Sequence, residues 1–258
     1  MTKGRAAAAP HIPDLITNTD PPEHTRLRRT VNAPFMVKRV EQWRPRIQQI
    51  IDSLIDDLLA GPNPADLVQA IGLPVPTLVI TQILGVPYAD HGFFQGASSR
   101  AISHDADPEV AAESSRSLGA YLGELLVKKM DEPADDVLSE MGARVKAGEM
   151  SHAEAVTMGA AILIAGHETS ASMISLGTLA LLHNPDQLAL LRERSDDPKF
   201  VANAVEELLR YLTIVHSGIR RIAIEDIELH GTTIRPATAW CSTCPAPTTT
   251  RPSSPSRT

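Results

Sequence analysis

Aromatic residues and cysteines are scarce in this chain. Aromatic side chains make up 3% of its 258 residues, as four phenylalanines, three tyrosines and two tryptophans. The core must therefore consist mainly of Leu, Ile, Val and Ala, and this composition favours helices. The two cysteines, Cys241 and Cys244, stand close together in a tail rich in Pro, Thr and Ser. Two such residues do not make the disulfide framework of a small secreted domain.

A basic surface and a long apolar run are missing as well. The net charge is −7, and no cluster of basic residues is interleaved with aromatics, so we expect no nucleic-acid partner. No apolar run reaches the roughly 18 residues of a membrane span. Pro10 and His11 interrupt the N-terminal alanine run, which therefore does not match a signal peptide. We expect a cytoplasmic protein that has no membrane partner.

Helical spacing of apolar residues dominates the chain over residues 22–211. A helix with a buried apolar stripe is expected over 43–58. A second helical pattern covers 65–84, and Pro74 and Pro76 are expected to bend or break it. Further helices are expected at 108–129, 136–146 and 198–211.

One helical pattern is much longer than the rest. It opens at Ser151, with Glu154 three residues later, an order typical of a capping box. It continues to about His183, before Asn184-Pro185, whereas helices of globular proteins usually run for about 8–20 residues. A helix of this length must cross the middle of a sizeable domain.

The chain changes character after Tyr211. Extended structure is expected over 219–229, followed by a turn and a short strand at Thr233–Ile234. From Ala237 onward there is neither an apolar period nor an acidic residue, so we expect disorder. The patterns predict an irregular N-terminal segment over 1–19, a helical domain over 20–236 and a disordered tail over 237–258.

An unusual run lies in the middle of the longest helical pattern, namely Ala165-Gly166-His167-Glu168-Thr169-Ser170. A mid-helix glycine costs about 1 kcal/mol relative to alanine, and Ser and Thr compete for backbone hydrogen bonds. Local conflicts of this kind often mark functional sites. A zinc site is excluded, because an H-E-x-x-H pattern needs a histidine where Ala171 stands. The alternative is a packing role, in which the Thr169 hydroxyl bonds to the Ala165 carbonyl beside a satisfied Glu168.

Three groups of charged residues are further candidates. His24 and Arg28 are one helical turn apart, so both could reach one anion. Glu207 and Arg210 share one face of the helix expected at 198–211. Arg220-Arg221 stands at the start of the extended segment. Each group by itself is more typical of a solvated surface than of a site.

Taken in order along the chain, these features resemble the cytochrome P450 family in its soluble bacterial form. The segment that resembles the C helix of that family is Asp20-Pro21-Pro22-Glu23-His24-Thr25-Arg26-Leu27-Arg28. The I helix resembles Ile162-Leu163-Ile164-Ala165-Gly166-His167-Glu168-Thr169, and the K-helix E-x-x-R motif resembles Glu207-Leu208-Leu209-Arg210. The resemblance covers about residues 20 to 236. It implies a mainly α, partial P450 fold with a short β segment, without the N-terminal sheet region and the haem-thiolate loop.

The resemblance implies a haem-dependent monooxygenase that hydroxylates or epoxidises a small hydrophobic organic substrate. It implies electrons from a ferredoxin-type donor and its reductase. Glu168 and Thr169 would be catalytic, because an acid beside a hydroxyl can relay protons to bound oxygen. Ala165 and Gly166 would line the haem side of the helix, where a glycine lets the helix open and oxygen approach the backbone.

The resemblance also assigns the three charged groups. His24 and Arg28 would neutralise the haem propionates from one side, and Arg221 from the other. Glu207 and Arg210 would form a buried structural network that supports the haem-loop region and takes no part in catalysis.

The two cysteines do not match the family. Its cysteine ligand lies on an F-x-x-G-x-x-x-C-x-G loop, and neither Cys241 nor Cys244 stands in such a loop, so no residue of this chain is assigned as a metal ligand. Read one nucleotide earlier, the codons for Ala-Thr-Ala-Trp-Cys-Ser-Thr-Cys can encode Gly-Asp-Gly-Val-Val-Phe-Asn-Leu, which resembles the family. We therefore hypothesise a frameshift near codon 236 and expect the chain to be inactive as written. The alternative is a non-catalytic helical fragment or pseudogene product that acts as a binding module.

Overall fold

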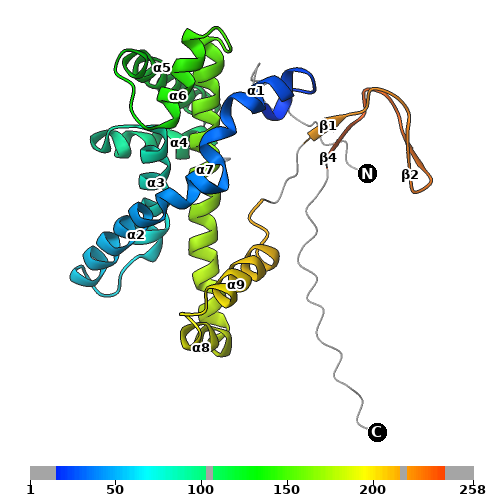
Figure 1. The fold of residues 1–258 in the computed structure, drawn as a ribbon. Coiled ribbons are helices and arrows are strands. Elements are labelled where there is room, and N and C mark those ends of the chain that lie inside the picture. Colours follow the sequence, from blue (N-terminus) through cyan, green and yellow to red (C-terminus); the bar gives the residue numbers. More distant parts are fainter. Residues whose placement is uncertain (1–15, 103–106, 216–219, 242–258) are drawn as a thin grey trace. The chain divides into compact units, whose positions relative to one another are not determined.

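A computed structural model describes residues 16–102, 107–215 and 220–241, in which helices dominate (Figure 1). The described residues form nine α-helices and four short strands, which confirms the mainly α class. The chain divides into two compact units, residues 1–171 and 172–258. The long helix α7 (His152–His183) belongs to both.

The first unit contains the helices that precede α7. They are α1 (Glu23–Val31), α2 (Val37–Ala60), α3 (Pro74–Leu84), α4 (His91–Ile102), α5 (Pro108–Asp131) and α6 (Val137–Lys146). Helices α3 to α6 gather around the N-terminal part of α7 (Figure 1). Their core is mostly aliphatic, as the composition predicts, and includes Leu84, Leu118, Leu122, Leu126, Leu138 and Leu163.

The capping box at the start of α7 forms as predicted. The Ser151 backbone N–H donates to Glu154 Oε2 at 2.6 Å, and the Glu154 backbone N–H donates to Ser151 Oγ at 3.1 Å. These bonds satisfy two of the backbone donors that a helix start leaves unpaired. The helices predicted at 108–129, 136–146 and 198–211 are also confirmed, as α5, α6 and α9 (Pro198–Tyr211).

Two predictions in the first unit are confirmed only in part. The helical pattern at 65–84 is broken rather than bent, because a short π-helical turn at Val68–Gly72 precedes α3. Pro74 stands at the first helical position, where its missing N–H costs nothing. The apolar stripe of α2 is mostly half-buried, and Ile50 alone is buried among the α2 residues, all of which are described.

The end of α3 is fixed by a contact with α6. Gly85 follows α3 with a φ of 83°, a conformation that favours glycine. A Cβ at this position would lie 2.2 Å from the Asp136 carboxyl group. That carboxyl group accepts the Ser139 N–H at 2.8 Å, so it caps α6, and it also pairs with Lys129. The contact therefore anchors α3, which packs against α7 at the candidate site.

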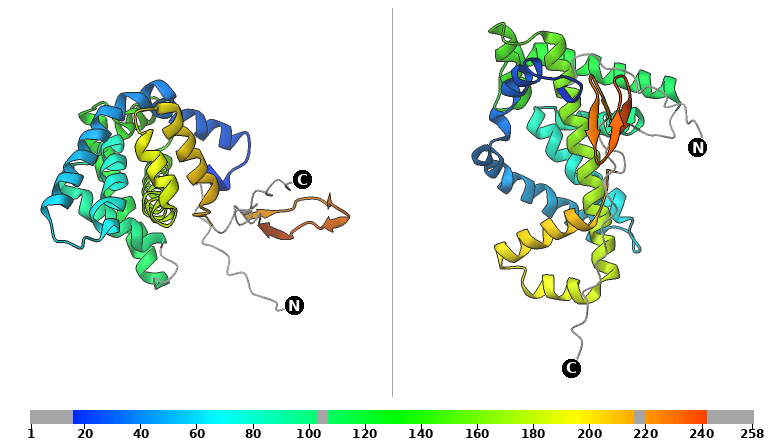
Figure 2. Two further views of the ribbon diagram at one scale, coloured as in Figure 1. Left: turned by 90° about the horizontal axis from the view of Figure 1, so that it is seen from below. Right: turned by 90° about the vertical axis from the view of Figure 1, so that its right-hand side faces the viewer.

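The second unit consists of the C-terminal part of α7, two helices and two strand pairs. Helix α8 (Pro185–Glu193) and α9 lie beside one another at the C-terminal end of α7 (Figure 2). Strand β1 (Arg220–Ile222) pairs antiparallel with β4 (Ala239–Cys241), with Arg221 opposite Trp240. Strand β2 (Ile227–Leu229) pairs antiparallel with β3 (Thr232–Ile234), with Leu229 opposite Thr232.

The predictions for the second unit are confirmed in part. The segment predicted as extended contains β1 and β2, which bends separate, and the predicted strand at Thr233–Ile234 lies in β3. The expected disorder from Ala237 does not hold for Ala239–Cys241, which form β4. Backbone pairing explains this, since β1 needs partners for its N–H and C=O groups and almost any side chains can supply them. Residues 242–258, including Cys244, lie outside the described residues.

Candidate functional site

The run around Gly166 lies in an unbroken stretch of α7. Ala165 and Thr169 stand one turn apart, and both are exposed. The Thr169 hydroxyl donates to the Ala165 carbonyl oxygen at 2.7 Å. This is the bond that the packing alternative predicts. Because the hydroxyl oxygen is exposed, it can still accept a hydrogen bond from another group. The catalytic role of Thr169 stays a prediction.

Gly166 lies against α3. A Cβ at this position would lie 2.8 Å from Ile80 Cδ1 and 3.0 Å from Ile80 Cγ1. The missing side chain therefore lets Ile80 pack against the α7 backbone. Close packing gives one reason for a glycine here, and the predicted role of Gly166 beside haem is not tested by it.

His167 is buried in the first unit, where its side chain is 1% exposed. Its Nδ1 lies 3.2 Å from Ser98 Oγ of α4 and 3.4 Å from Glu168 Oε1. Among the described residues, Nε2 has no hydrogen-bond partner. Burial lowers the pKa of His167 below its usual range, and the nearby Glu168 charge opposes this only in part. The imidazole is therefore neutral at pH 7.

The burial of His167 was not predicted, although the sequence contains a signal for it. Leu163 and Ala171 stand one turn before and after His167, and both are buried. A helix period drawn through these residues points His167 into the core. Glu168, one position further around the helix, is half-buried, with 29% of its side chain exposed.

His24 and Arg28 lie on one side of α1. His24 is half-buried and Arg28 is exposed. Neither side chain makes a hydrogen bond or ion pair with any residue in the described parts of the chain. Two cationic or donor groups without partners, one turn apart, form a surface that suits a carboxylate or phosphate ligand.

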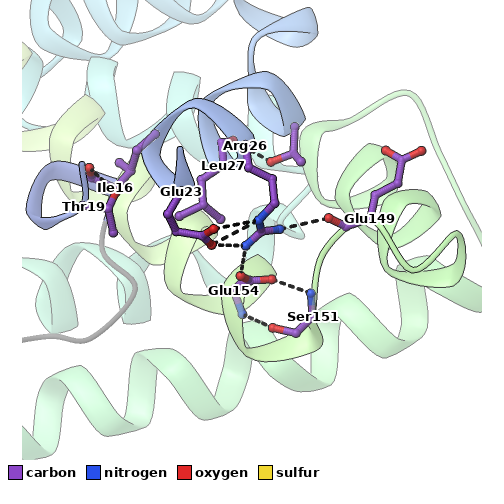
Figure 3. Close-up of polar contacts among 9 residues, drawn as sticks. Ile16, Thr19, Glu23, Arg26, Leu27, Glu149, Ser151 and Glu154 are labelled. Atoms are coloured by element: carbon purple, nitrogen blue, oxygen red, sulfur yellow. Dashed lines mark hydrogen bonds and ion pairs between the residues drawn. The ribbon is translucent and has the colours of Figure 1, made fainter. Parts of the chain in front are cut away.

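Arg26 lies on a different side of α1 and is fully engaged (Figure 3). Its guanidinium donates to Glu23, to the carboxylate of Glu154 and, at 3.1 Å, to the Glu149 carbonyl oxygen. Because positions 24 and 28 are offset from 26 by two residues, this contact turns His24 and Arg28 away from the start of α7. Arg26 thus fixes the orientation of α1. The sequence gives no local signal for this pairing, since 128 residues separate Arg26 from Glu154.

The Glu154 carboxylate serves both α7 and α1. Burial alone would raise its pKa, but hydrogen bonds from Ser151 and Arg26 outweigh burial and lower the pKa. The same network raises the pKa of Arg26, chiefly through its bond to Glu23. Both groups are therefore charged throughout the neutral range.

Glu207 and Arg210 pair on the surface of α9. Arg210 donates to both Glu207 oxygens at 2.6 Å, and this bond lowers the pKa of Glu207. The predicted burial is not found, because the side chains are 59% and 56% exposed and no described element of this unit covers them. Beside the pair, α7, α8 and α9 line an apolar hollow of about 420 Å³ that includes Leu181, Leu191, Phe200 and Leu208.

The remaining candidates lie in or beyond the strands. Arg221 is the central residue of β1, and the structure describes its backbone but not its side chain. Cys241 ends β4. Among the described residues, no three His, Cys, Asp or Glu side chains cluster as metal ligands. No described helix is both long and apolar enough to cross a bilayer.

Fold and site together define a mainly helical protein with two distinctive surfaces in its first unit. One is the open α7 face with Ala165 and Thr169, and the other is the unpaired His24 and Arg28 of α1. The cytochrome P450 family model matches residues 124–240, a range that includes α7, α8, α9 and strands β1 to β3.

Curated relatives extend this match over most of the chain. It is 54% identical over 223 residues to cytochrome P450 CYP105Q4 of Mycobacterium marinum, covering 86% of this chain and 54% of the relative. It is 51% identical over 216 residues to cytochrome P450 GfsF of Streptomyces halstedii, covering 84% and 52%. The chain belongs to the cytochrome P450 family. It spans about half the length of the curated relatives that it matches.

Solved structures agree with the fold. The crystal structure of GfsF matches with a TM-score of 0.81 at 49% identity, over 88% of this chain and 57% of that chain. The mycinamicin VIII C21 methyl hydroxylase MycCI of Micromonospora griseorubida matches with a TM-score of 0.80 at 42% identity, over 86% and 56%. The present fold is thus a partial P450 fold.

Proposed function

We propose that this chain is part of a P450 monooxygenase that inserts one oxygen atom into a small hydrophobic organic substrate, by hydroxylation or epoxidation. The observation that carries this is the pair of open surfaces on α1 and α7, whose residues have the types and order that the chemistry needs. Haem, when bound through a thiolate, supplies the oxygen activation of such enzymes.

The α1 surface fits the propionate groups of haem. His24 and Arg28 have no competing partner among the described residues, and both can donate charge-assisted hydrogen bonds to carboxylates. Ala165 presents a small, exposed side chain that leaves room for a flat ring against α7. The propionate role of Arg221 stays a prediction from the sequence.

The α7 surface fits proton delivery. Thr169 exposes a hydroxyl group, and Glu168 is the adjacent, half-buried carboxylate. A carboxylate and a hydroxyl next to one another can pass a proton inward from solvent in two short steps. Ala165 and Gly166 add no polar side chain to this face of α7. The Thr169 hydroxyl is therefore the polar side-chain group that α7 would present to the haem ring. Glu207 and Arg210 have a structural role in α9.

The names of the relatives support the substrate class. MycCI is a methyl hydroxylase crystallised with mycinamicin VIII, and a protein of Streptomyces griseolus that is 40% identical is a vitamin D3 dihydroxylase. Both names describe the hydroxylation of an organic molecule, which supports an organic substrate and a hydroxylation reaction here. Electrons would come from a ferredoxin-type donor and its reductase in the cytoplasm.

A polypeptide of these 258 residues would not catalyse the reaction by itself. Neither cysteine of the sequence stands in the family's ligand loop. The second candidate function is a helical binding module, favoured by the apolar hollow between α8 and α9.

The test is the spectrum of the reduced, CO-bound protein. The chain is expressed with haem supply, purified, reduced and exposed to CO. We expect a haem spectrum without the Soret band of a thiolate-bound iron. A thiolate-type band would contradict the proposed inactivity, and a protein that takes up no haem would favour the binding module.

A further inference from the structure

His167 has an unusual hydrogen-bonding state for a residue that is 1% exposed. Its Nδ1 has two polar neighbours, Ser98 Oγ at 3.2 Å and Glu168 Oε1 at 3.4 Å. Its Nε2 is buried and has no partner among the described residues. A buried polar atom left unpaired costs about 1–3 kcal/mol, which a leucine at this position would not. Packing alone therefore does not account for a histidine.

The hydrogen bonds of Ser98 decide which ring nitrogen carries the proton. Its hydroxyl donates to the Phe94 carbonyl oxygen at 2.8 Å, within α4. Having one proton, that hydroxyl can only accept from His167, so Nδ1 must be the N–H nitrogen. Nε2 is then the unprotonated nitrogen, which is the cheaper of the two to leave unpaired in an apolar site, because protonating it would bury an unpaired donor.

We propose that His167 is a positioning residue, a neutral imidazole whose Nδ1–H joins α7 to α4 and holds the carboxylate of Glu168 beside Thr169. This rests on the proposed function, which gives Glu168 and Thr169 their role. The imidazole attracts the carboxylate because Nδ1, whose polarised N–H also faces Ser98 Oγ, lies 3.4 Å from Glu168 Oε1. Movement of α4 would reach Glu168 through Ser98 and His167.

The charges around His167 are consistent with a neutral ring. From α7 itself, Glu168 is the charged neighbour, and it favours protonation. From α4, Ser98 is the polar neighbour, and Arg100 lies two residues further on and donates to Ser114 of α5 at 3.3 Å instead. Gly166 packs against Ile80 of α3, which adds an apolar neighbour. Burial therefore dominates and lowers the pKa of His167.

The test is NMR of the full chain with ¹⁵N-labelled histidine, without haem. Long-range ¹H–¹⁵N correlations distinguish the two tautomers. We expect His167 as the Nδ1–H form at pH 7, with a titration midpoint below the usual value of about 6.5. Glu168→Gln should lower the midpoint further, because it removes the charge that favours protonation. Ser115→Ala, at a site where the serine bonds only within α5, is the matched control for Ser98→Ala and should change nothing at His167.

Positioning itself is read from the Glu168 side chain. In the unaltered chain, its χ1 couplings should show one rotamer, and in His167→Leu they should show averaging. Ser98→Ala should increase the population of the Nε2–H tautomer. Thermal unfolding of His167→Leu at or above that of the unaltered chain verifies that the variant folds.

Three results would overturn the proposal. They are an Nε2–H or doubly protonated ring at pH 7, a midpoint that Glu168→Gln leaves unchanged, and a Glu168 rotamer that is the same in His167→Leu. The measurement does not involve haem, so failure of the proposed function through absent haem binding would leave it unaffected.

Discussion

Gly166 is the residue at which packing and the proposed chemistry coincide. Its missing Cβ lets Ile80 approach the α7 backbone, and it also stands at the predicted haem side of the helix. The sequence predicted that this position was special, because glycine is unfavourable inside a helix. It could not reveal Ile80, which is brought in by the fold from a helix far away in the chain.

A double-mutant cycle tests the packing of Gly166. Gly166→Ala should gain up to about 1 kcal/mol of helix propensity and lose about 1–3 kcal/mol through overpacking against Ile80. In an Ile80→Val background, which removes Cδ1, the same substitution should be more favourable by about 1 kcal/mol. Urea unfolding of the four proteins measures this coupling.

Gly119→Ala is the matched control for this cycle. Gly119 lies inside α5, and a Cβ there meets nothing within 4 Å. The Gly119→Ala substitution should therefore raise the free energy of unfolding by up to about 1 kcal/mol, whether or not Ile80 is changed. If Gly166→Ala behaves like Gly119→Ala and adds simply to Ile80→Val, the close packing is not what holds Gly166.

Helices α1 and α7 show how far local patterns reach. The start of α7 was predicted from Ser151 and Glu154 because a capping box is formed by residues three apart. The positions of α5, α6 and α9 were likewise predicted from residues close together in the sequence. The π-helical turn before Pro74 and the contact of Arg26 with Glu154 were not predicted, because both depend on tertiary packing.

Two substitutions separate the two roles of Glu154, which caps the start of α7 and, through its ion pair with Arg26, clamps α1 to α7. Ser151→Ala should cost about 1 kcal/mol through loss of the cap. Glu154→Gln keeps the capping geometry but removes the negative charge that pairs with Arg26. It should lower the free energy of unfolding by about 1 kcal/mol or less. Chemical denaturation at pH 7 measures both costs.

The pH dependence of Glu154 follows from its lowered pKa. The stabilisation is fully present above the unfolded pKa of about 4.3 and is lost as the pH falls through the folded value. The difference in the free energy of unfolding between Glu154→Gln and the unaltered chain should therefore become smaller as the pH falls below about 4.3. A difference that stays constant from pH 7 to pH 3 would show that the carboxylate charge does not stabilise the clamp.

At the scale of the whole molecule, the sequence was informative about family and class but not about surfaces. The order of His24, Gly166, Glu168 and Glu207 was enough to indicate the family, since each stands in a local motif. The exposure of the Glu207–Arg210 pair and of Leu182, at 63%, was not predictable from local patterns. Exposure depends on what covers a helix, and the chain spans about half the length of its curated relatives.

The decisive measurement is a spectroscopic titration of the chain with haemin, compared with haemin dimethyl ester, whose propionates are blocked. If His24 and Arg28 hold the propionates, the ester and the His24→Gln/Arg28→Gln variant should each bind about tenfold more weakly or worse, since charge-assisted hydrogen bonds contribute about 1.5–3 kcal/mol each. Arg29→Gln, one position further around α1, should bind like the unaltered chain. Haemin and its ester binding equally well, or no dependence on His24 and Arg28, would contradict the assignment of this surface to haem.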